Sequence, residues 1–599
     1  MKISNILLAT LSAGIFFTGC TKMQEKAVHE IEKVDSELRP LAALLKQNLE
    51  PVPDLKIVED VRWANQGWSA KESEWFWHVP QGTIIMPYEW FISLEQPSKD
   101  GKGLFIEPAY MARYGFIPSA KNDSNNPDGL PIGFVKEESF FDPINNITMP
   151  VAGLSCAACH TGQINYNGKG LLIDGGAAMI NVTLFQDKVT VTLAETLLST
   201  TKFDRFAKRV LKDAYSEGSK KELKAKMKAF AKRSSAYSSA MILKNLNVVK
   251  EGFGRVDALT RIGNVVFGAG INTENLRPIS APVSYPPIWS VPWFDWAQYN
   301  GSIRQPMVRN VGEALGVQAI VNLVDKDRLF TSSIPVDNLK NIEDLLAGDE
   351  PFTGLQAPKW PEDILGSLDK DKIKHGKKLY KKHCASCHLP PMGSKEIMKA
   401  KHWEKPNKFG KSYLITHNIP LEEIGTDGAE VTDFYNRRAH TDGLGLGTMN
   451  ANDGLRVVTE AVAQRWYKDN NIPQDQWAKW DGFRENKVLR PLAYRARPLN
   501  GIWSTPPFLH NGSVPNLYEL LSPFTERSKE FYTGSKEFDP IFVGYQTTPF
   551  KGGFLMDTTL QGNGNSGHIF DDLPKGDGVI GPKLSKKERW ALVEYLKSL

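Results

Sequence analysis

The chain has 599 residues, enough for more than one domain, and 41% of them are hydrophobic and 24% charged. These values are typical of a folded globular protein and exclude a disordered chain, a fibrous repeat and a protein that crosses the membrane many times. The 73 basic and 68 acidic side chains give a net charge of only +5, which argues against a nucleic-acid-binding protein.

The first 20 residues are typical of an export signal. Lys2 is followed by an apolar stretch and then by small residues that lead to Cys20. The stretch is too short to span a membrane, so we expect a secretory signal peptide. Residues 17–20 resemble a bacterial lipobox, which implies cleavage before Cys20 and a lipid anchor on its thiol. Thr21 follows it, and the sorting pattern that this resembles implies the periplasmic face of the outer membrane. The alternative is a plain signal peptide and a periplasmic or secreted protein.

The other four cysteines form two copies of the pattern C-x-x-C-H, at residues 156–160 and 384–388. This pattern is the attachment site of haem c, in which both thiols bond to the haem and the histidine binds the iron. A zinc site would need the two pairs close together, and neither a thioredoxin-like motif nor a simple disulfide explains a histidine after both pairs. The sequence therefore predicts two covalent haem c groups. Their attachment and iron-binding residues are Cys156, Cys159 and His160, and Cys384, Cys387 and His388.

The chain between the motifs contains a basic helical segment and an aromatic segment. Residues 202–248 are basic and predict a solvated pair of amphipathic helices, which we favour over a membrane- or partner-binding segment. Aromatic residues gather in 285–296, as they do in a smaller cluster at 75–78. They are expected to line a dry substrate cavity or to carry electrons, although tryptophan is also common in cores. The candidate catalytic side chains here are Trp289, Trp293 and Phe294.

Two predicted helices frame the second motif. Residues 370–383 have apolar side chains on one face and run directly into Cys384. The chain ends in a second amphipathic helix, which Ser585 caps together with Glu588. This arrangement is typical of a class I cytochrome c. The predicted fold is mainly α with long irregular loops, and it has two cytochrome c-like haem domains with large insertions, at 21–359 and 360–599.

The other iron ligands decide whether each haem moves electrons or binds a small molecule. His568 lies in the glycine-rich stretch 562–570, whose backbone can approach a flat macrocycle closely, so it is the candidate second ligand opposite His388. Met449 is the alternative. His510 is expected to order a turn near a haem propionate. No residue stands out as a second ligand opposite His160.

Several stretches carry a family resemblance. The two motifs, together with Trp503-Ser504-Thr505-Pro506-Pro507-Phe508-Leu509-His510-Asn511-Gly512-Ser513-Val514-Pro515, resemble the bacterial dihaem cytochrome c peroxidase superfamily. Further stretches narrow the resemblance to one branch of this superfamily, a large oxygenase-type branch that contains haem rubber oxygenases and dihaem fatty-acid dioxygenases. They are residues 78–83, 87–90, 254–258, 296–301, 309–313 and 567–568.

The resemblance implies a role for each haem. His160 would hold the active haem, whose other face would be open to O₂. His388 and His568 would both bind a closed relay or structural haem, and residues 289–296 would line the active pocket. Family members also often contain a calcium ion, for which the sequence offers no specific ligand pattern.

The sequence leaves three functions open. The favoured one is an oxidoreductase that uses O₂ at the first haem to oxygenate an apolar unsaturated substrate, either a small molecule or a polymer. The second is a peroxidase that reduces H₂O₂, and the third is an electron carrier that serves a redox partner protein. A dry aromatic pocket favours the oxygenase, whereas a polar pocket with Glu or Gln favours the peroxidase.

Overall fold

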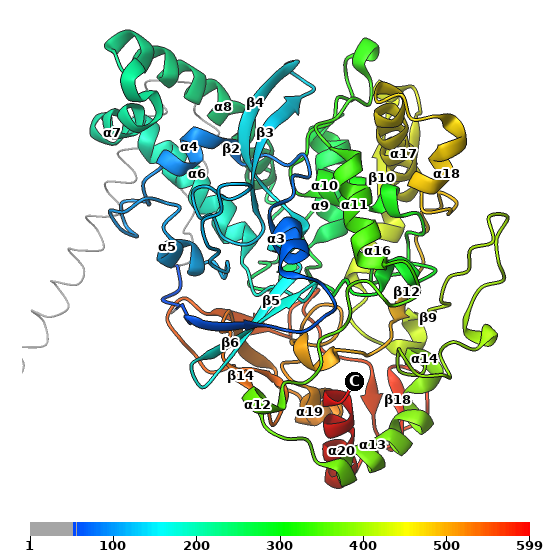
Figure 1. The fold of residues 1–599 in the computed structure, drawn as a ribbon. Helices are drawn as coiled ribbons and strands as arrows, with labels where there is room; N and C mark the ends of the chain where they lie inside the picture. The colour runs from blue at the N-terminus through cyan, green and yellow to red at the C-terminus, as the bar shows by residue number, and fades with distance from the viewer. Residues whose placement is uncertain (1–51, 56) are drawn as a thin grey trace, which may run out of the picture. The chain divides into compact units, whose positions relative to one another are not determined.

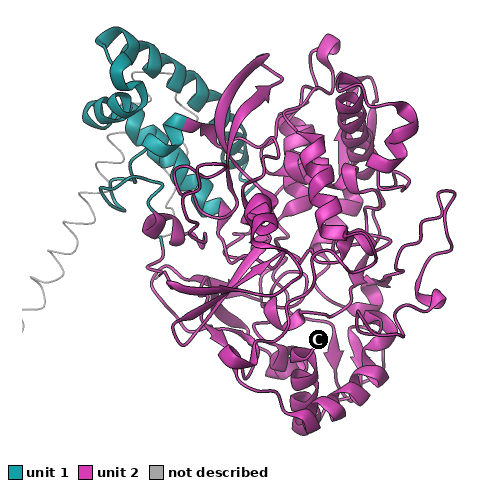
Figure 2. Ribbon diagram, viewed as in Figure 1, with its two compact units in different colours: residues 1–52, 89–107, 183–247 teal, residues 53–88, 108–182, 248–599 magenta. Residues whose placement is uncertain are grey.

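The computed structural model describes residues 52–55 and 57–599, so the predicted signal peptide and Cys20 lie outside the described residues. The chain forms two compact units (Figure 2). Unit 1 comprises residues 1–52, 89–107 and 183–247, and unit 2 comprises residues 53–88, 108–182 and 248–599. Both C-x-x-C-H motifs belong to unit 2. The boundary predicted between residues 359 and 360 therefore does not coincide with a boundary between these units.

Unit 1 contains the basic helical segment. Its long helices are α6 (Val182–Leu198), α7 (Thr200–Leu211) and α8 (Glu217–Leu243), so the predicted helix pair is confirmed. Helix α7 begins after Ser199, whose side chain caps it, and it buries Phe203 and Phe206 on one face. The opposite face is charged, and both Arg205 and Arg209 form ion pairs with Glu95 of the same unit.

Two three-stranded sheets in unit 2 surround the first motif. Cys156–Ala158 form one 3₁₀ turn, and this turn connects one sheet to the other. The first sheet has the order β2-β4-β3, and the second has the order β1-β6-β5. Their bounds are Met86–Pro87 (β2), Ile147–Leu154 (β4), Phe134–Asp142 (β3), Asp60–Trp63 (β1), Lys169–Asp174 (β6) and Thr161–Tyr166 (β5). Helices form most of the regular structure, as predicted, but these strands were not predicted.

Helices pack on one another in the middle of unit 2. Helix α10 (Pro306–Gly316) packs against α9 (Ala258–Gly263), α11 (Val336–Ala347) and α17 (Ala451–Asp469) (Figure 1). A π-helical turn, Asn264–Ala269, follows α9 directly. In the described part of the chain, no helix combines the length and apolar character needed to cross a bilayer.

The second motif is framed by the two helices predicted for it. Helix α13 (Lys370–His383) runs into α14 (Ala385–His388) and packs side by side with the C-terminal helix α20 (Lys586–Lys597) (Figure 1). The predicted capping box of Ser585 and Glu588 is confirmed. The two helices approach closely because residue 376 is glycine: a Cβ there would lie 2.0 Å from the carbonyl oxygen of Ala591.

Short elements complete unit 2. Its remaining helices are α3 (Ala70–His78), α5 (Pro108–Ala112), α12 (Glu362–Leu365), α15 (Leu421–Ile424), α16 (Ala429–Asn436), α18 (Trp477–Trp480) and α19 (Leu517–Leu520), and α4 (Tyr88–Ser93) crosses the boundary between the units. Its remaining strands pair as β7 (Arg255–Val256) with β8 (Val283–Ser284), β9 (His417–Pro420) with β12 (Ala493–Ala496), β10 (Arg438–His440) with β11 (Thr448–Asn450), β13 (Glu530–Thr533) with β16 (Phe554–Asp557), β14 (Phe538–Asp539) with β15 (Gly544–Tyr545), and β17 (Ile569–Phe570) with β18 (Val579–Gly581).

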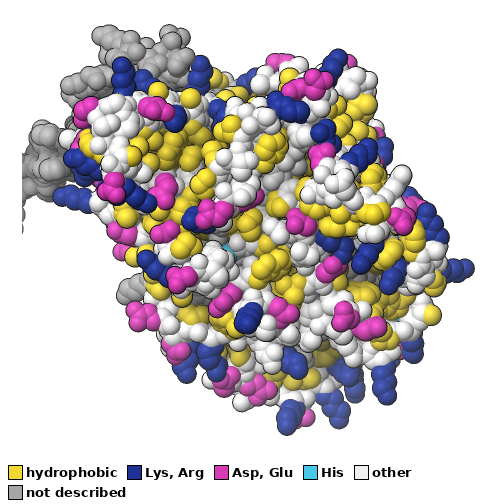
Figure 3. Space-filling view, turned by 45° about the horizontal axis from the view of Figure 1, so that its top comes forward, with side chains coloured by type: hydrophobic (Ala, Val, Ile, Leu, Met, Phe, Trp, Pro, Cys, Tyr) yellow, Lys and Arg dark blue, Asp and Glu magenta, His cyan; other side chains and the backbone are white. Residues whose placement is uncertain are grey.

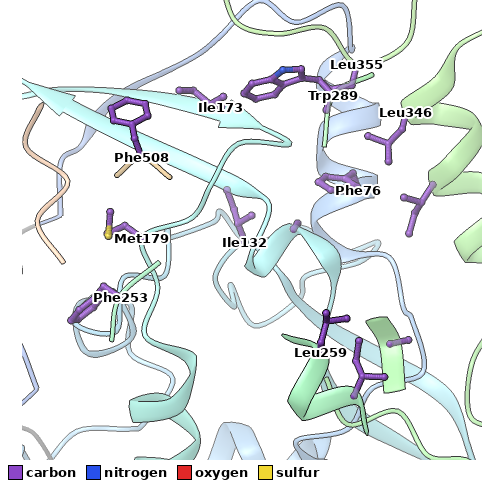
Figure 4. Close-up of a cluster of buried hydrophobic side chains, with 14 of the residues drawn as sticks. Phe76, Ile132, Ile173, Met179, Phe253, Leu259, Trp289, Leu346, Leu355 and Phe508 are labelled. Carbon is purple, nitrogen blue, oxygen red and sulfur yellow. The ribbon is translucent and has the colours of Figure 1, made fainter. Parts of the chain in front are cut away.

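The hydrophobic core of unit 2 surrounds the sheet that follows the first motif. Ile173 of β6 lies near Trp289 and Leu355 in this core (Figure 4). Trp289 is only 2% exposed, which is typical of a large aromatic side chain that anchors a core. On the face seen in Figure 3, basic and acidic side chains are interspersed, as the nearly balanced charge of the chain predicts.

Candidate functional site

The first motif presents a neutral, oriented imidazole. Nδ1 of His160 donates a hydrogen bond to the carbonyl oxygen of Pro286 at 2.9 Å, which leaves Nε2 free to bind a metal. Burial, assisted by the positive charge of Arg309, lowers the pKa of His160 to about 4. The ring is therefore uncharged at neutral pH, as a metal ligand must be.

The thiols of the first motif are suited to covalent attachment rather than to metal binding. Burial raises the pKa of both Cys156 and Cys159 to about 12, so both thiols are protonated at neutral pH. The backbone N–H and the thiol of Cys156 both contact Oε1 of Gln81, at 3.1 and 3.0 Å. A zinc site would instead need thiolates, and no disulfide joins the four cysteines of the described residues.

Helix α10 supplies a polar wall at this motif. Arg309 pairs with Glu343 at 2.5 Å and with Glu313 at 3.9 Å. Glu313 also accepts a hydrogen bond from Gln298 at 2.8 Å, and its negative charge contributes to the raised pKa of the Cys156 thiol. Burial raises the pKa of Glu313, although 38% of its side chain is accessible. The carboxyl group is thus only partly enclosed by neighbouring protein atoms.

The second motif orients its histidine in the same way. Nδ1 of His388 donates to the carbonyl oxygen of Arg497 at 2.7 Å. The hydroxyl group of Tyr380, on α13, donates to the carbonyl oxygen of Leu389 at 2.8 Å and so fixes the chain just after the motif. Burial raises the pKa of Cys384 to about 12. The two motifs therefore offer the same donor set: two thiols and one imidazole with a free Nε2.

His568 lies opposite His388. The centroids of their rings are 6.2 Å apart, at an interplanar angle of 64°. Imidazole nitrogens bind transition metals at roughly 2 Å, which puts the centroids of two rings on opposite sides of one metal ion roughly 6 Å apart. Nδ1 of His568 is buried without a hydrogen-bond partner, and burial with the nearby His388 lowers its pKa to about 3. Met449 instead lies in β11, where it pairs with Ala439 of β10, and its sulfur lies beside Gly454 of α17.

The loop that carries His568 is tightly held. A Cβ on Gly567, where φ is +71°, would lie 2.3 Å from backbone atoms of Gly425 and Thr426, so this position requires glycine. The buried guanidinium of Arg527 donates to the carbonyl oxygens of Gly567 and His568 at 2.8 and 2.9 Å. These contacts fix the backbone on both sides of the imidazole.

Residues 510–513 also hold this loop. The side-chain amide of Asn511 donates to the carbonyl oxygens of Gly562 and Gly564, at 3.2 and 2.9 Å, and the hydroxyl group of Ser513 donates to Gly564 as well. His510 is buried and stacks on Tyr494 of β12, with ring centroids 4.0 Å apart. The structure therefore gives His510 a packing contact within the framework of the second motif.

A buried arginine near the second motif fits the carboxylates of a haem. Nη1 of Arg495 is buried without a hydrogen-bond partner, and burial lowers the pKa of this guanidinium to about 10. A buried cationic donor of this kind calls for an anion, and haem propionates are anionic. The orphaned nitrogens of Arg495 and His568, the paired thiols and the oriented His388 thus all fit a covalently bound haem.

The three aromatic residues that the sequence predicted for the active pocket lie in different surroundings. Phe294 packs with Leu389 in a small cluster beside the second motif, and its ring lies 5.3 Å from the guanidinium carbon of Arg495. Trp293 donates from Nε1 to the carbonyl oxygen of Ala347 at 2.8 Å. Trp289 lies in the main core. Phe294 therefore belongs to the surroundings of the second motif rather than of the first, where it was expected.

Sequence reasoning missed the residues that support the ligands. These are Glu313, Arg495, Arg497 and Arg527. Arg495 and Arg497 carried one usable signal. Arg495 lies in the short strand β12, whose other residues are alanine and tyrosine, and Arg497 directly follows it, where charge is rarely buried. No group of three or more His, Cys, Asp or Glu side chains within residues 52–55 and 57–599 is placed to hold a metal ion, so the calcium site remains a prediction.

Comparisons with known proteins agree with this geometry. Residues 493–532 match the family model described as RoxA-like, cytochrome c-like. This segment contains Arg495 and Arg497. It also contains Asn511, Ser513 and Arg527, whose side chains form hydrogen bonds with the loop that carries His568. It thus supplies much of the framework of the second motif, and the match identifies a haem c-binding cytochrome region.

Two relatives come from Sinorhizobium fredii. The chain is 23% identical to "Uncharacterized protein y4iM" over 336 residues, which is 54% of this chain and 66% of that protein. It is 42% identical to "Uncharacterized protein y4iJ" over 574 residues, which cover 92% of this chain and 95% of that protein. This protein therefore belongs to the family of y4iJ, and it carries a RoxA-like cytochrome c region.

Proposed function

We propose that this protein is an exported dihaem c-type cytochrome that uses O₂ at the haem of the first motif to oxygenate an apolar unsaturated substrate. One observation supports the proposal. Both motifs hold the histidine of the C-x-x-C-H pattern by a hydrogen bond from Nδ1 to a carbonyl group, but the surroundings that this histidine faces differ. His388 faces a second imidazole at 6.2 Å. Within the described residues, the aromatic ring neighbour of His160 is Tyr285, at 6.5 Å, and no second histidine faces it.

This difference supports a division of labour. A haem iron with one open face binds O₂ or peroxide, whereas an iron with two imidazoles moves electrons or stabilises the fold. At the first motif, Pro286 holds the imidazole of His160, and the thiols of Cys156 and Cys159 fix the edge of the cofactor. At the second motif, Arg497, Arg527 and Asn511 hold the two imidazoles in place, as a relay or structural centre requires.

Peroxide reduction is the second candidate function, and Glu313 is the observation that favours it. Its carboxyl group lies beside the first motif, is held by Gln298 and has a raised pKa. A carboxyl group with a raised pKa is suited to carry a proton between atoms of a bound substrate. A pocket with Glu and Gln is what the sequence analysis associated with a peroxidase, so the oxidant has to be measured directly.

The test is a carbon monoxide titration of the fully reduced protein. We expect one CO for every two haems, because only the iron at His160 has an open face. Oxygen uptake is then measured with unsaturated fatty acids and with polyisoprene, and anaerobic H₂O₂ turnover is measured beside it. Uptake of O₂ with either substrate supports the oxygenase, whereas turnover of H₂O₂ alone supports the peroxidase. If no CO binds, the protein is an electron carrier and the enzymatic proposal fails.

The proposal also includes the place of the protein in the cell. We propose that Cys20 carries a lipid that anchors the protein to the periplasmic face of the outer membrane. Haem c is attached to reduced cysteine thiols outside the cytoplasm, which requires an exported chain. Cys20→Ser is expected to move the haem-loaded protein from the membrane fraction to the soluble periplasmic fraction, as measured by haem staining of the two fractions.

A further inference from the structure

One segment of unit 2 connects the two iron-binding histidines. Residues 285–289 lie between the motifs in the sequence. Two adjacent carbonyl groups of this segment accept hydrogen bonds, one from the histidine of the first motif and the other from an arginine near the second motif. The carbonyl oxygen of Pro286 accepts from Nδ1 of His160 at 2.9 Å. The next carbonyl oxygen, that of Pro287, accepts from Nη1 of Arg497 at 2.8 Å.

Arg497 completes the connection with its own backbone. Its carbonyl oxygen accepts from Nδ1 of His388 at 2.7 Å. A continuous path therefore runs from one imidazole to the other through three hydrogen bonds and covalent bonds. It passes from His160 to Pro286, along the chain to Pro287, to the guanidinium of Arg497, and through that residue to His388.

Other contacts hold the path in place. The backbone N–H of Ile288 donates to Gly175 at 2.9 Å, on the side of the first motif. Nε1 of Trp289 donates to the carbonyl oxygen of Asn500 at 3.0 Å, on the side of the second motif. The guanidinium carbon of Arg497 lies 5.9 Å from the ring centroid of Trp289. The segment is thus tied to both motifs and cannot shift towards one without moving the other.

The guanidinium of Arg497 has no carboxylate partner within residues 52–55 and 57–599 of the structure. The positive charge of Arg495 contributes to the lowered pKa of Arg497. Burial lowers the pKa of Arg497 to about 9. A charged donor that is buried and aimed at one carbonyl oxygen makes a strong, directional hydrogen bond.

We propose that Arg497 is a positioning residue that couples the two iron centres through their histidines. A hydrogen bond to Nδ1 sets the basicity of an iron-bound imidazole, and linked hydrogen bonds polarise one another. A change of charge at one iron therefore alters the hydrogen bonds along the path and, through them, the ligand affinity of the other iron. This inference rests on the proposed function, because it requires a haem at both motifs.

The variant Arg497→Gln tests this path selectively. It removes the bond to Pro287 but leaves the carbonyl groups that orient His160 and His388. The affinity of the first haem for CO is measured twice, with the second haem oxidised and with it reduced. The ratio of the two dissociation constants measures the coupling. We expect a ratio different from one in the wild type, and a change of this ratio towards one by about two- to tenfold in Arg497→Gln.

Controls separate this inference from the proposed function. Arg438→Gln, at an exposed arginine of β10, should keep the wild-type ratio. Arg497→Lys keeps a positive donor and should give an intermediate ratio, and it replaces the Gln variant if that variant does not fold. Two haems per chain with equal ratios in the wild type and Arg497→Gln would overturn the coupling alone. A single haem per chain would overturn the proposed function and the coupling with it.

Discussion

His568 is the residue whose replacement most directly tests the closed iron centre. In His568→Ala, His388 loses the imidazole that faces it at 6.2 Å, so the second iron is expected to become open. The low-spin absorption and electron paramagnetic resonance signals of that haem should be lost, and CO binding should rise from one to two per chain. His440→Ala, at an exposed histidine, is the control. A low-spin signal that persists in His568→Ala would return Met449 to consideration.

A second residue, Glu430, makes stability depend on pH. Burial, assisted by the negative charge of Asp257, raises the pKa of Glu430 to about 8, and its Oε2 is buried without a partner. In the unfolded chain a glutamate has a pKa of about 4.3, so the folded state binds the proton more tightly. Stability from this group is therefore complete below pH of about 4 and is lost as the pH rises through about 8.

Glu430→Gln removes this dependence. The variant should be close to the wild type near pH 5 and should be more stable near pH 9 by several kcal/mol. The free energy of unfolding at both pH values, followed by circular dichroism, is the measurement. Glu422→Gln, at an exposed glutamate close in sequence, should show no gain at either pH. An equal effect of Glu430→Gln at both pH values would show that the carboxyl group does not titrate in this range.

At the scale of single residues, sequence reasoning named the candidate ligands and missed the residues that hold them in place. His160, His388 and His568 stand in motifs whose neighbours already suggest iron binding. Arg497 and Arg527 act through backbone carbonyl groups of segments that are distant in the sequence. Any residue has a carbonyl group, so such contacts leave no pattern of side-chain types that could have been read beforehand.

At the scale of elements, the crossing of α13 and α20 depends on Gly376. A Cβ at this position would lie 2.0 Å from the carbonyl oxygen of Ala591 and 2.6 Å from Cβ of Tyr595. The first atom belongs to a helix backbone, which cannot move aside without separating the helices. Gly376→Ala should therefore destabilise the protein by at least about 2 kcal/mol, although alanine favours a helix more than glycine does.

The matched control is another helical glycine. In α8, a Cβ on Gly218 would meet only Oγ of Ser216, at 3.8 Å. Gly218→Ala should therefore leave stability unchanged or raise it by up to about 1 kcal/mol. Chemical unfolding of the haem-loaded protein compares the two variants. Equal stabilities of the two variants would mean that the helices can separate without cost.

Helices were easier to predict than strands in this chain. The periodic apolar residues of α13 and α20 and the cap at Ser585 are local signals, and the structure confirms them. The strands around the first motif do not show alternating apolar and polar residues, because β5 and β6 are buried on both faces for most of their length. One local signal was present: Asn167-Gly168 forms the hairpin turn between them, with φ values of 49° and 76°.

At the scale of the whole molecule, the two motifs share one compact unit although they lie in structurally different surroundings. The first lies between two small sheets, and the second directly follows helix α13, which packs against α20. The RoxA-like segment 493–532 supplies Arg497, which reaches towards the first motif, and Arg527, which holds the ligand loop of the second. The positions of the two motifs in the sequence predicted two successive domains. Sequence order cannot show that one segment, residues 493–532, contacts the surroundings of both motifs.

The different surroundings predict that the two haem sites can be emptied independently. Each motif has its own thiols and its own oriented histidine, so Cys156→Ala with Cys159→Ala should leave one haem per chain, attached at the second motif. This variant should lose CO binding and keep the low-spin signal of the iron between His388 and His568.

The reciprocal variant, Cys384→Ala with Cys387→Ala, should also retain one haem but should keep CO binding and lose the low-spin signal. Haem content per chain, measured as the pyridine haemochrome, is read beside the CO difference spectrum for both variants. CO binding that survives the loss of Cys156 and Cys159 would place the open iron at the second motif. That result would contradict the assignment of His568, because an iron held between two imidazoles has no free position for CO.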